Sequence, residues 1–139
     1  MRVYADFMAR VDSPSGAPFE AVRLNCAGTV FDLCRAQARL HDGLALTLFS
    51  DSGDGEDLEA DATVRWVASP VGGRSGFWVG EFDPGRLRHV PSTRRVDNDA
   101  DVPCLACGRL TKLSVQNVLD ERCLRCGARA LDVLAPSDK

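Results

Sequence analysis

The chain carries Cys104-Leu105-Ala106-Cys107-Gly108 and then Cys123-Leu124-Arg125-Cys126-Gly127, with fifteen residues between Cys107 and Cys123. Two copies of C-x-x-C-G at this separation are typical of a four-thiolate zinc site. Two cysteines three positions apart can reach one tetrahedral ion from a single tight turn, at metal–sulfur distances of about 2.3 Å. The spacing therefore predicts that Cys104, Cys107, Cys123 and Cys126 bind one metal ion.

Four thiolates fill a tetrahedral ion and leave no position for water or substrate, so we expect this zinc to be structural. Gly108 and Gly127 suit the positive φ that turns backbone amides toward the sulfurs. Iron is an alternative, because it also accepts four thiolates. Two disulfides are a further alternative, but residues 1–6 show no apolar signal segment, which favours a reducing, cytoplasmic location. A redox C-x-x-C usually occurs singly, whereas here two are paired.

Residues 109–122 alternate apolar and polar side chains and contain a candidate turn at Asn117. We expect a β-hairpin between the two cysteine turns, with a third strand at 128–134. This arrangement resembles a zinc ribbon. Residues 91–103 are polar with a proline at each end, which is typical of a linker.

The 139-residue chain has room for one domain of about 100 residues and a small module. Apolar residues make up 45% and charged residues 27%, an ordinary soluble composition, and no apolar run approaches a membrane span. Residues 1–91 have a net charge of −4 and residues 102–139 a net charge of +2. An acidic body with a mildly basic end does not predict tight non-specific binding to nucleic acid.

Short apolar runs separated by turns fill residues 1–91. The clearest is 58–67, where Ala60, Ala62, Val64 and Trp66 alternate with polar residues, which predicts a half-buried strand. Five or six strands at this spacing predict a small β-barrel, and no segment demands a long helix. The other strands are expected at 1–11, 19–24, 29–34, 44–49 and 77–82.

The order of these elements resembles a PilZ domain. Leu40-His41-Asp42-Gly43 followed by 44–48 is similar to that family's leucine-x-x-glycine and apolar strand, 62–66 to its A-x-V-x-W strand, and 77–82 to its V-G-x-x-F return. The resemblance covers about 65% of the chain and implies a six-stranded antiparallel barrel. Many PilZ domains bind cyclic di-GMP. The predicted organisation is a PilZ-like barrel at 1–91, a linker at 92–103 and a zinc ribbon at 104–134.

The nucleotide-binding motifs of that family are degenerate in this chain. Binding members carry R-x-x-x-R before the first strand and a [DN]-x-S-x-x-G turn, whose arginines hold phosphates. Here the matching segments are 2–6, which ends in Asp6, and 25–30, which lacks both the serine and the final glycine. The resemblance therefore implies the scaffold without the nucleotide site.

Other candidate residues have ordinary structural interpretations. We expect Cys26 and Cys34 to be buried reduced thiols, His41 and His89 to lie on the surface, and the acidic segment 51–57 to be a solvated loop because it lacks the calcium-binding ladder. Trp66, Phe77, Trp78 and Phe82 are expected in the core or barrel wall. Because side chains alternate along the strand, one of Phe77 and Trp78 would face outward and mark a protein contact. The ribbon contains no aromatic residue between 102 and 139. Its basic side chains form a scattered face that consists of Arg109, Lys112, Arg122, Arg125 and Arg129.

The sequence favours a non-enzymatic, cytoplasmic regulatory or adaptor protein that binds a protein partner, because no nucleophile, base or open metal position can be named. The PilZ resemblance implies bacterial signalling or the assembly of a surface or motility apparatus. A second hypothesis is a nucleic-acid-associated regulator that uses the basic face of the ribbon. A third is a cyclic di-GMP receptor with a non-standard site.

Overall fold

The computed structural model describes residues 1–51, 55–68, 76–92 and 99–134. Within these ranges the chain is mainly β, which confirms the predicted fold class at that level. None of the helices in the described ranges is long and apolar enough to cross a membrane. The elements in chain order are β1 (Arg2–Tyr4), β2 (Arg10–Asp12), β3 (Glu20–Arg23), α1 (Ala27–Arg35), β4 (Ala45–Asp51), β5 (Glu56–Ala68), β6 (Gly76–Phe82), the 3-10 helix η1 (Pro84–Arg86), β7 (Arg88–Pro91), β8 (Asp99–Pro103), β9 (Leu110–Ser114) and α2 (Ala130–Leu134).

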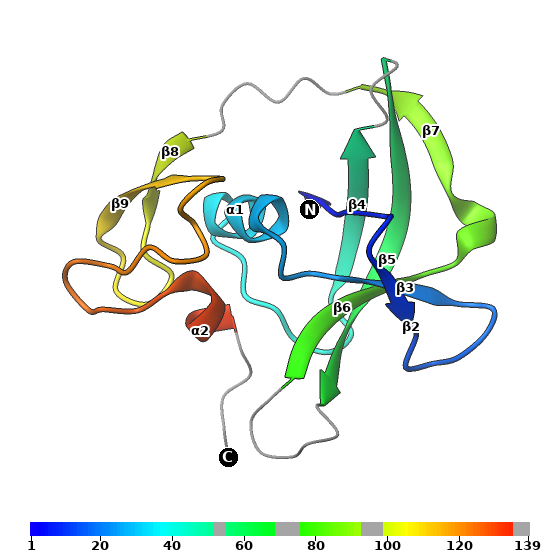
Figure 1. The fold of residues 1–139 in the computed structure, drawn as a ribbon, viewed down its shortest axis with the longest axis horizontal. Helices are drawn as coiled ribbons and strands as arrows, with labels where there is room; N and C mark the ends of the chain where they lie inside the picture. The colour runs from blue at the N-terminus through cyan, green and yellow to red at the C-terminus, as the bar shows by residue number, and fades with distance from the viewer. Residues whose placement is uncertain (52–54, 69–75, 93–98, 135–139) are drawn as a thin grey trace.

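The large sheet is organised around β5. Its strand order is β1-β4-β5-β6-β3-β2, with β7 also paired to β5. The β1–β4 pair is parallel and the other pairs are antiparallel. β4 lies along one edge of β5, while β7 pairs with the opposite edge at 56–59 and β6 at 63–68. Figure 1 shows the resulting strongly curved sheet.

The described strands do not close into a barrel, so the predicted six-stranded antiparallel barrel is wrong. β1 and β2 are the ends of the sheet. Closure depends on strand tilt and stagger, which side-chain alternation does not encode. The alternation itself is confirmed, because Ala60, Ala62 and Val64 of β5 are all buried.

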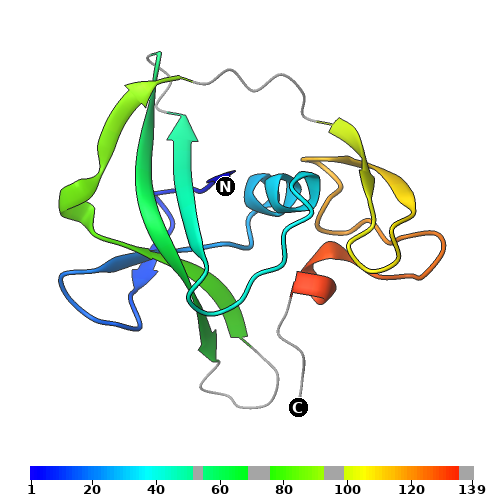
Figure 2. The same ribbon diagram turned by 180° about the vertical axis from the view of Figure 1, so that it is seen from behind.

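Residues 27–35 form helix α1 instead of the strand predicted at 29–34. The β-formers Val30 and Phe31 suggested a strand, but the apolar residues also follow helical spacing, with Ala27, Val30, Phe31 and Cys34 on one side. Figures 1 and 2 show that α1 lies between the curved sheet and the C-terminal ribbon. The helix can therefore bury its apolar side chains against both of these neighbours. The Asp32 carboxylate accepts the Tyr4 N–H at 2.8 Å, which ties α1 to β1.

The ribbon begins before its first cysteine. Residues 99–103, at the end of the expected linker, form β8 and pair antiparallel with β9. The predicted hairpin between the cysteine turns is therefore wrong, because β9 pairs with a strand that precedes both turns. The predicted third strand at 128–134 is also wrong, since Ala130–Leu134 form helix α2.

Sheet, helix and ribbon share one hydrophobic core. Val102, Leu113, Val118 and Leu134 of the ribbon belong to the same buried cluster as the residues of the sheet and α1. A module of this size buries too little apolar surface to be stable alone. The ribbon therefore depends on the body for part of its core.

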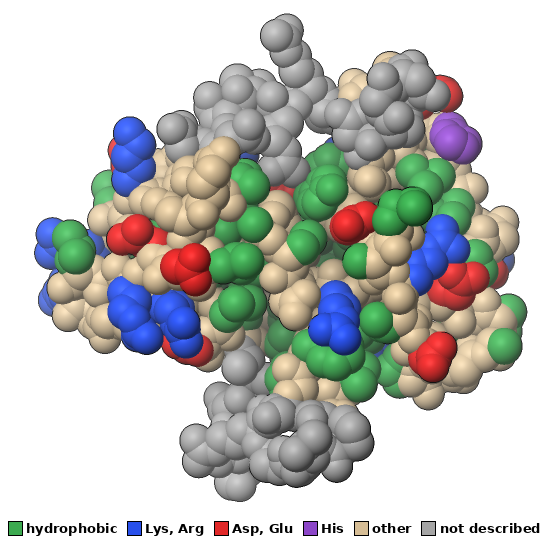
Figure 3. Space-filling model, in the orientation of Figure 1, with side chains coloured by type: hydrophobic (Ala, Val, Ile, Leu, Met, Phe, Trp, Pro, Cys, Tyr) green, Lys and Arg blue, Asp and Glu red, His purple; other side chains and the backbone are tan. Residues whose placement is uncertain are grey.

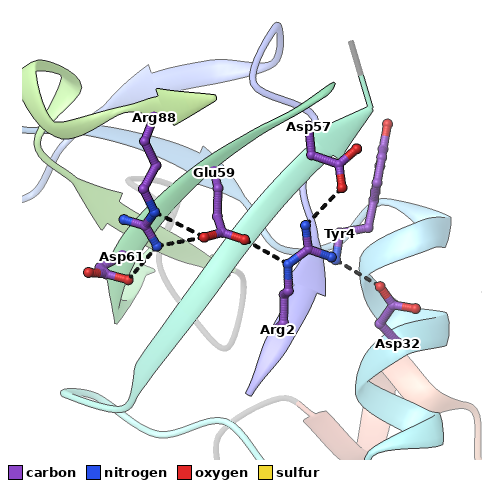
Figure 4. Close-up of polar contacts among 7 residues, drawn as sticks. All are labelled: Arg2, Tyr4, Asp32, Asp57, Glu59, Asp61 and Arg88. Atoms are coloured by element: carbon purple, nitrogen blue, oxygen red, sulfur yellow. Dashed lines mark hydrogen bonds and ion pairs between the residues drawn. The ribbon is translucent and has the colours of Figure 1, made fainter. Parts of the chain in front are cut away.

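An ion-pair network fastens the first strand to β5 and β7 (Figure 4). The Arg2 guanidinium donates to Glu59 at 2.7 Å and to Asp57 at 2.8 Å, and Arg88 donates to the other Glu59 oxygen at 3.0 Å. Asp57 is buried, so the expectation of a solvated loop at 51–57 is wrong at this residue, while 52–54 lie outside the described residues. The hydrogen bond from Arg2 is the main cause that lowers the pKa of Glu59, against the opposing effect of burial.

We predict that Glu59→Gln destabilises the folded protein at pH 7 by about 1–3 kcal/mol, because two guanidinium groups lose a charged partner. The lowered pKa means that Glu59 contributes its stability above the unfolded carboxyl pKa of about 4.3, and that this contribution disappears as the pH falls through the lower folded value. Denaturant unfolding at pH 7 and at pH 3 measures the difference between wild type and variant.

Glu20→Gln is the matched control, since Glu20 also pairs with an arginine, Arg10, but its side chain is 40% exposed. We expect a cost below about 1 kcal/mol for this exposed pair. Equal costs for the two variants, or a difference for Glu59→Gln that persists undiminished at pH 3, would contradict the account of the network.

Candidate metal centre

The four cysteines of the two C-x-x-C-G motifs meet at one point of the ribbon. Their sulfur atoms all lie within 4.8 Å of one another. The Cys104 and Cys126 sulfurs are 3.7 Å apart, and the Cys107 and Cys123 sulfurs are 3.5 Å apart. Each turn thus supplies one sulfur to each of these close pairs.

These distances fit a metal ion better than disulfides. A tetrahedron with metal–sulfur bonds of 2.3 Å has edges of about 3.8 Å, close to both sulfur separations. A disulfide requires about 2.05 Å, and all six cysteines are free. The cluster is therefore compatible with a metal ion such as zinc.

Backbone amides favour thiolates in the cluster. The amides of Cys126 and Arg125 donate to the Cys123 sulfur and lower the pKa of Cys123 to about 6. The Ala128 amide donates to Cys126, but burial and the neighbouring sulfurs outweigh it and raise the pKa of Cys126 to about 11. Four adjacent sulfurs cannot all ionise without a cation, and a divalent ion at the centre would remove this conflict.

Two side chains that follow α1 hold the first cysteine turn against the body. The Gln37 side-chain amide donates to the carbonyl oxygens of Cys34 and Pro103, at 2.7 and 2.8 Å, and the Arg39 guanidinium donates to the carbonyl of Leu105. Gln37 itself has a φ of +54°. Sequence analysis missed both residues, because their partners are backbone carbonyls that leave no motif.

The second cysteine turn is connected to the sheet through α2. The indole N–H of Trp78 donates to the Leu134 carbonyl at 2.6 Å, and both residues are buried. Trp78 also packs edge-on against Trp66, with ring centroids 5.1 Å apart. An apolar hollow of about 180 Å³ lies beside this pair and is bordered by Leu131 and Leu134. Seven residues lie between Cys126 and Leu134, so α2 joins the second cysteine turn to the contact with Trp78 over a short stretch of chain.

Cys34 lies behind the cluster and borders the same small cavity as Cys104 and Cys123. Burial is the main cause that raises its pKa to about 11, and Cys104 adds to the effect. Cys34 is therefore a neutral, buried thiol, as the sequence predicted. Cys26 is only half-buried and lies 2.9 Å from the Thr29 hydroxyl oxygen.

The remaining candidates lie outside the cluster. His41 and His89 are exposed, which confirms the prediction for both. The sequence predicts that Phe77 and Trp78 point to opposite faces of their strand. Trp78 is buried, whereas Phe77 is half-buried, with the Arg23 guanidinium carbon 4.2 Å from the centre of its ring.

The basic residues of the ribbon do not form one free face. Arg129 pairs with Asp132 at 3.2 Å, and Arg122 donates to the Gly127 carbonyl at 3.0 Å. Within the described part of the chain, Arg109, Lys112 and Arg125 form no ion pair. Figure 3 shows Lys and Arg on the ribbon side, at the left, interspersed with hydrophobic and acidic side chains.

Comparisons with family models, with curated proteins and with solved structures each found no match to this chain. No family finding supports the PilZ resemblance.

We predict that Gly127→Ala weakens zinc binding about five- to thirtyfold. Gly127 has a φ of +75°, and no atom lies within 4 Å of an added Cβ, so the cost is the roughly 1–2 kcal/mol of left-handed backbone. Competition with a chromophoric chelator measures the affinity. Gly16→Ala is the matched control, with a φ of +76° and the same open surroundings in the body, and it should leave zinc affinity unchanged. An unaltered affinity in Gly127→Ala would contradict the role of this turn.

We predict that removal of the metal exposes Trp78. A five-residue helix is not stable alone, so α2 should separate from the sheet when the second cysteine turn loosens. In a Trp66→Phe background, Trp78 is the single tryptophan, and its emission should shift to the red on chelation.

Cys126→Ser should show the red-shifted emission without chelator, whereas Cys26→Ser should behave like the parent protein. Identical emission with and without bound zinc would show that α2 holds its place independently of the metal.

Proposed function

We propose that the protein is a non-catalytic adaptor or regulatory module, in which one structural zinc ion, bound by Cys104, Cys107, Cys123 and Cys126, fixes a ribbon on a β-sheet body. The convergence of the four sulfurs carries this proposal. Four thiolates complete a tetrahedral ion, so the metal has no position at which to activate water or substrate. Its contribution is folding free energy for the ribbon.

A protein partner is the interaction that we favour. The ribbon is anchored to the body through α1 and α2 and shares its core, so its outer surface is presented in a fixed orientation. A rigid surface binds with a smaller ordering cost than a tethered one. The thiolate cluster requires reduced cysteines, which is consistent with a cytoplasmic protein.

The role in bacterial signalling rests on the PilZ resemblance of the sequence alone. In the candidate phosphate-binding arm, residues 2–6, Arg2 stands at the position of the family's first arginine and Asp6 at that of the second. Arg2 already donates hydrogen bonds to Asp57 and Glu59. A phosphate would have to compete with two carboxylates for this guanidinium. The network therefore favours a scaffold role over a cyclic di-GMP receptor.

The test is purification of the tagged full chain, at its natural level, from cells that produce it. We expect a second protein in stoichiometric amount, which stays bound to the chain through nuclease treatment and size-exclusion chromatography. Cys126→Ser should lose it and Cys26→Ser should retain it, because only the first removes a metal ligand.

Recovery of nucleic acid alone, lost on nuclease treatment, would replace this proposal with the nucleic-acid hypothesis. Calorimetric binding of cyclic di-GMP in the micromolar range would replace it with the receptor hypothesis. A chain that migrates without any companion would also contradict it.

A further inference from the structure

The two cysteine turns have the same pattern of backbone hydrogen bonds. In the first, the Cys104 amide donates to Arg109 O at 2.8 Å and the Gly108 amide to Cys104 O at 2.9 Å. In the second, the Cys123 amide donates to Ala128 O at 2.9 Å and the Gly127 amide to Cys123 O at 2.8 Å. Both glycines have positive φ. Leu105 and Leu124 therefore occupy equivalent positions at the tips of two matching turns.

The first turn uses its tip to dock within the chain. Leu105 is half-buried and packs against the common core, and its carbonyl receives the Arg39 guanidinium. A leucine tip and an arginine thus form the contact between the first turn and the body. The position after the leucine is the small Ala106.

The second turn presents the same tip to solvent. Leu124 is 86% exposed, and Leu110, at the start of β9, is 65% exposed. Residues 122–127 include two exposed arginines, Arg122 and Arg125, and no acidic residue. Arg125 stands where the docked turn has Ala106, and it makes no ion pair within the described residues. The second turn therefore has the leucine of a docking tip and a basic side chain next to it.

We propose that Leu124 and Arg125, with Arg122, dock an acidic segment of a partner protein. The leucine would enter an apolar pocket of the partner, and the guanidinium groups would pair with carboxylates around it. An exposed leucine tip suits a protein surface better than a nucleic acid, for which the ribbon lacks any stacking aromatic residue between 102 and 139. This inference rests on the proposed adaptor function and names the surface that performs it.

The first experiment places the photo-crosslinking residue benzoylphenylalanine at position 124 of the full chain, in cells that naturally produce it. A second preparation carries the same residue at Met8, which is 94% exposed on the body. We expect an adduct at position 124 with another protein, whose crosslinked peptide contains an excess of Asp and Glu. An adduct with nucleic acid, with a second copy of this chain or with a neutral or basic peptide would overturn the inference, as would no adduct at position 124.

The crosslinked peptide then serves as the probe for affinity measurements with the zinc-loaded chain. Leu124→Ser and Arg125→Glu should each weaken binding about tenfold or more, and added salt should weaken it further. Met8→Ser and Arg86→Glu are matched controls on the body, with similarly exposed side chains, and should change the affinity less than about twofold. Equal zinc content in all five proteins excludes a loss of the metal site, and an unchanged affinity in Leu124→Ser would overturn the inference.

The two proposals fail differently. Protein adducts at Met8 with none at position 124 would remove the docking surface and leave the adaptor function standing. Absence of protein adducts at both positions, together with a chain that purifies without a companion, would remove both.

Discussion

Four sulfur atoms held 3.5–3.7 Å apart in two close pairs are the constraint on which the ribbon depends. Thiolates at this distance repel one another, and backbone amides relieve only part of that repulsion. A cation at the centre would satisfy all four at once and would close both cysteine turns in one step. The short strands β8 and β9 and the five-residue helix α2 have little stability of their own without that closure.

The body stabilises the ribbon through packing and hydrogen bonds outside the cysteine cluster. α1 lies between sheet and ribbon and buries residues toward both, while Gln37 and Arg39 bond to carbonyls beside the first cysteine turn. Trp78 receives the other end of the ribbon through the Leu134 carbonyl. A metal ion bound by the four cysteines would stabilise the same ribbon that these packing contacts hold against the sheet, so loss of the ion should weaken the contacts. The adaptor function that we propose would use this coupling to keep its surface rigid.

Sequence analysis found the features that local patterns encode. The cysteine spacing identified the cluster, because four ligands from two short turns leave little geometric freedom. Alternation identified β5, since its buried residues recur every second position. The same reasoning missed α1, where β-branched and aromatic composition obscured a helical spacing. It also missed β8, because the polar composition of 99–103 is typical of a linker and its pairing with β9 is not visible in the sequence. It could not predict whether the sheet closes. Gln37, Arg39 and Trp78 act through backbone partners, which no spacing rule predicts.

The difference between the two cysteine turns emerges only from the three-dimensional structure. In sequence, Leu105 and Leu124 are matching positions of a repeated motif, but only the fold shows that one is docked and the other exposed. That asymmetry leaves one cysteine turn packed against the body and the other with its leucine exposed to solvent. We infer that both turns depend on the four sulfur atoms being held together by one metal ion.

X-ray absorption at the zinc edge of the protein, purified under reducing conditions from cells grown without added metal, tests that claim most directly. The account predicts one zinc per chain surrounded by four sulfur atoms at about 2.3 Å. A metal-free protein, or zinc bound by nitrogen or oxygen atoms in place of some of the sulfurs, would contradict it.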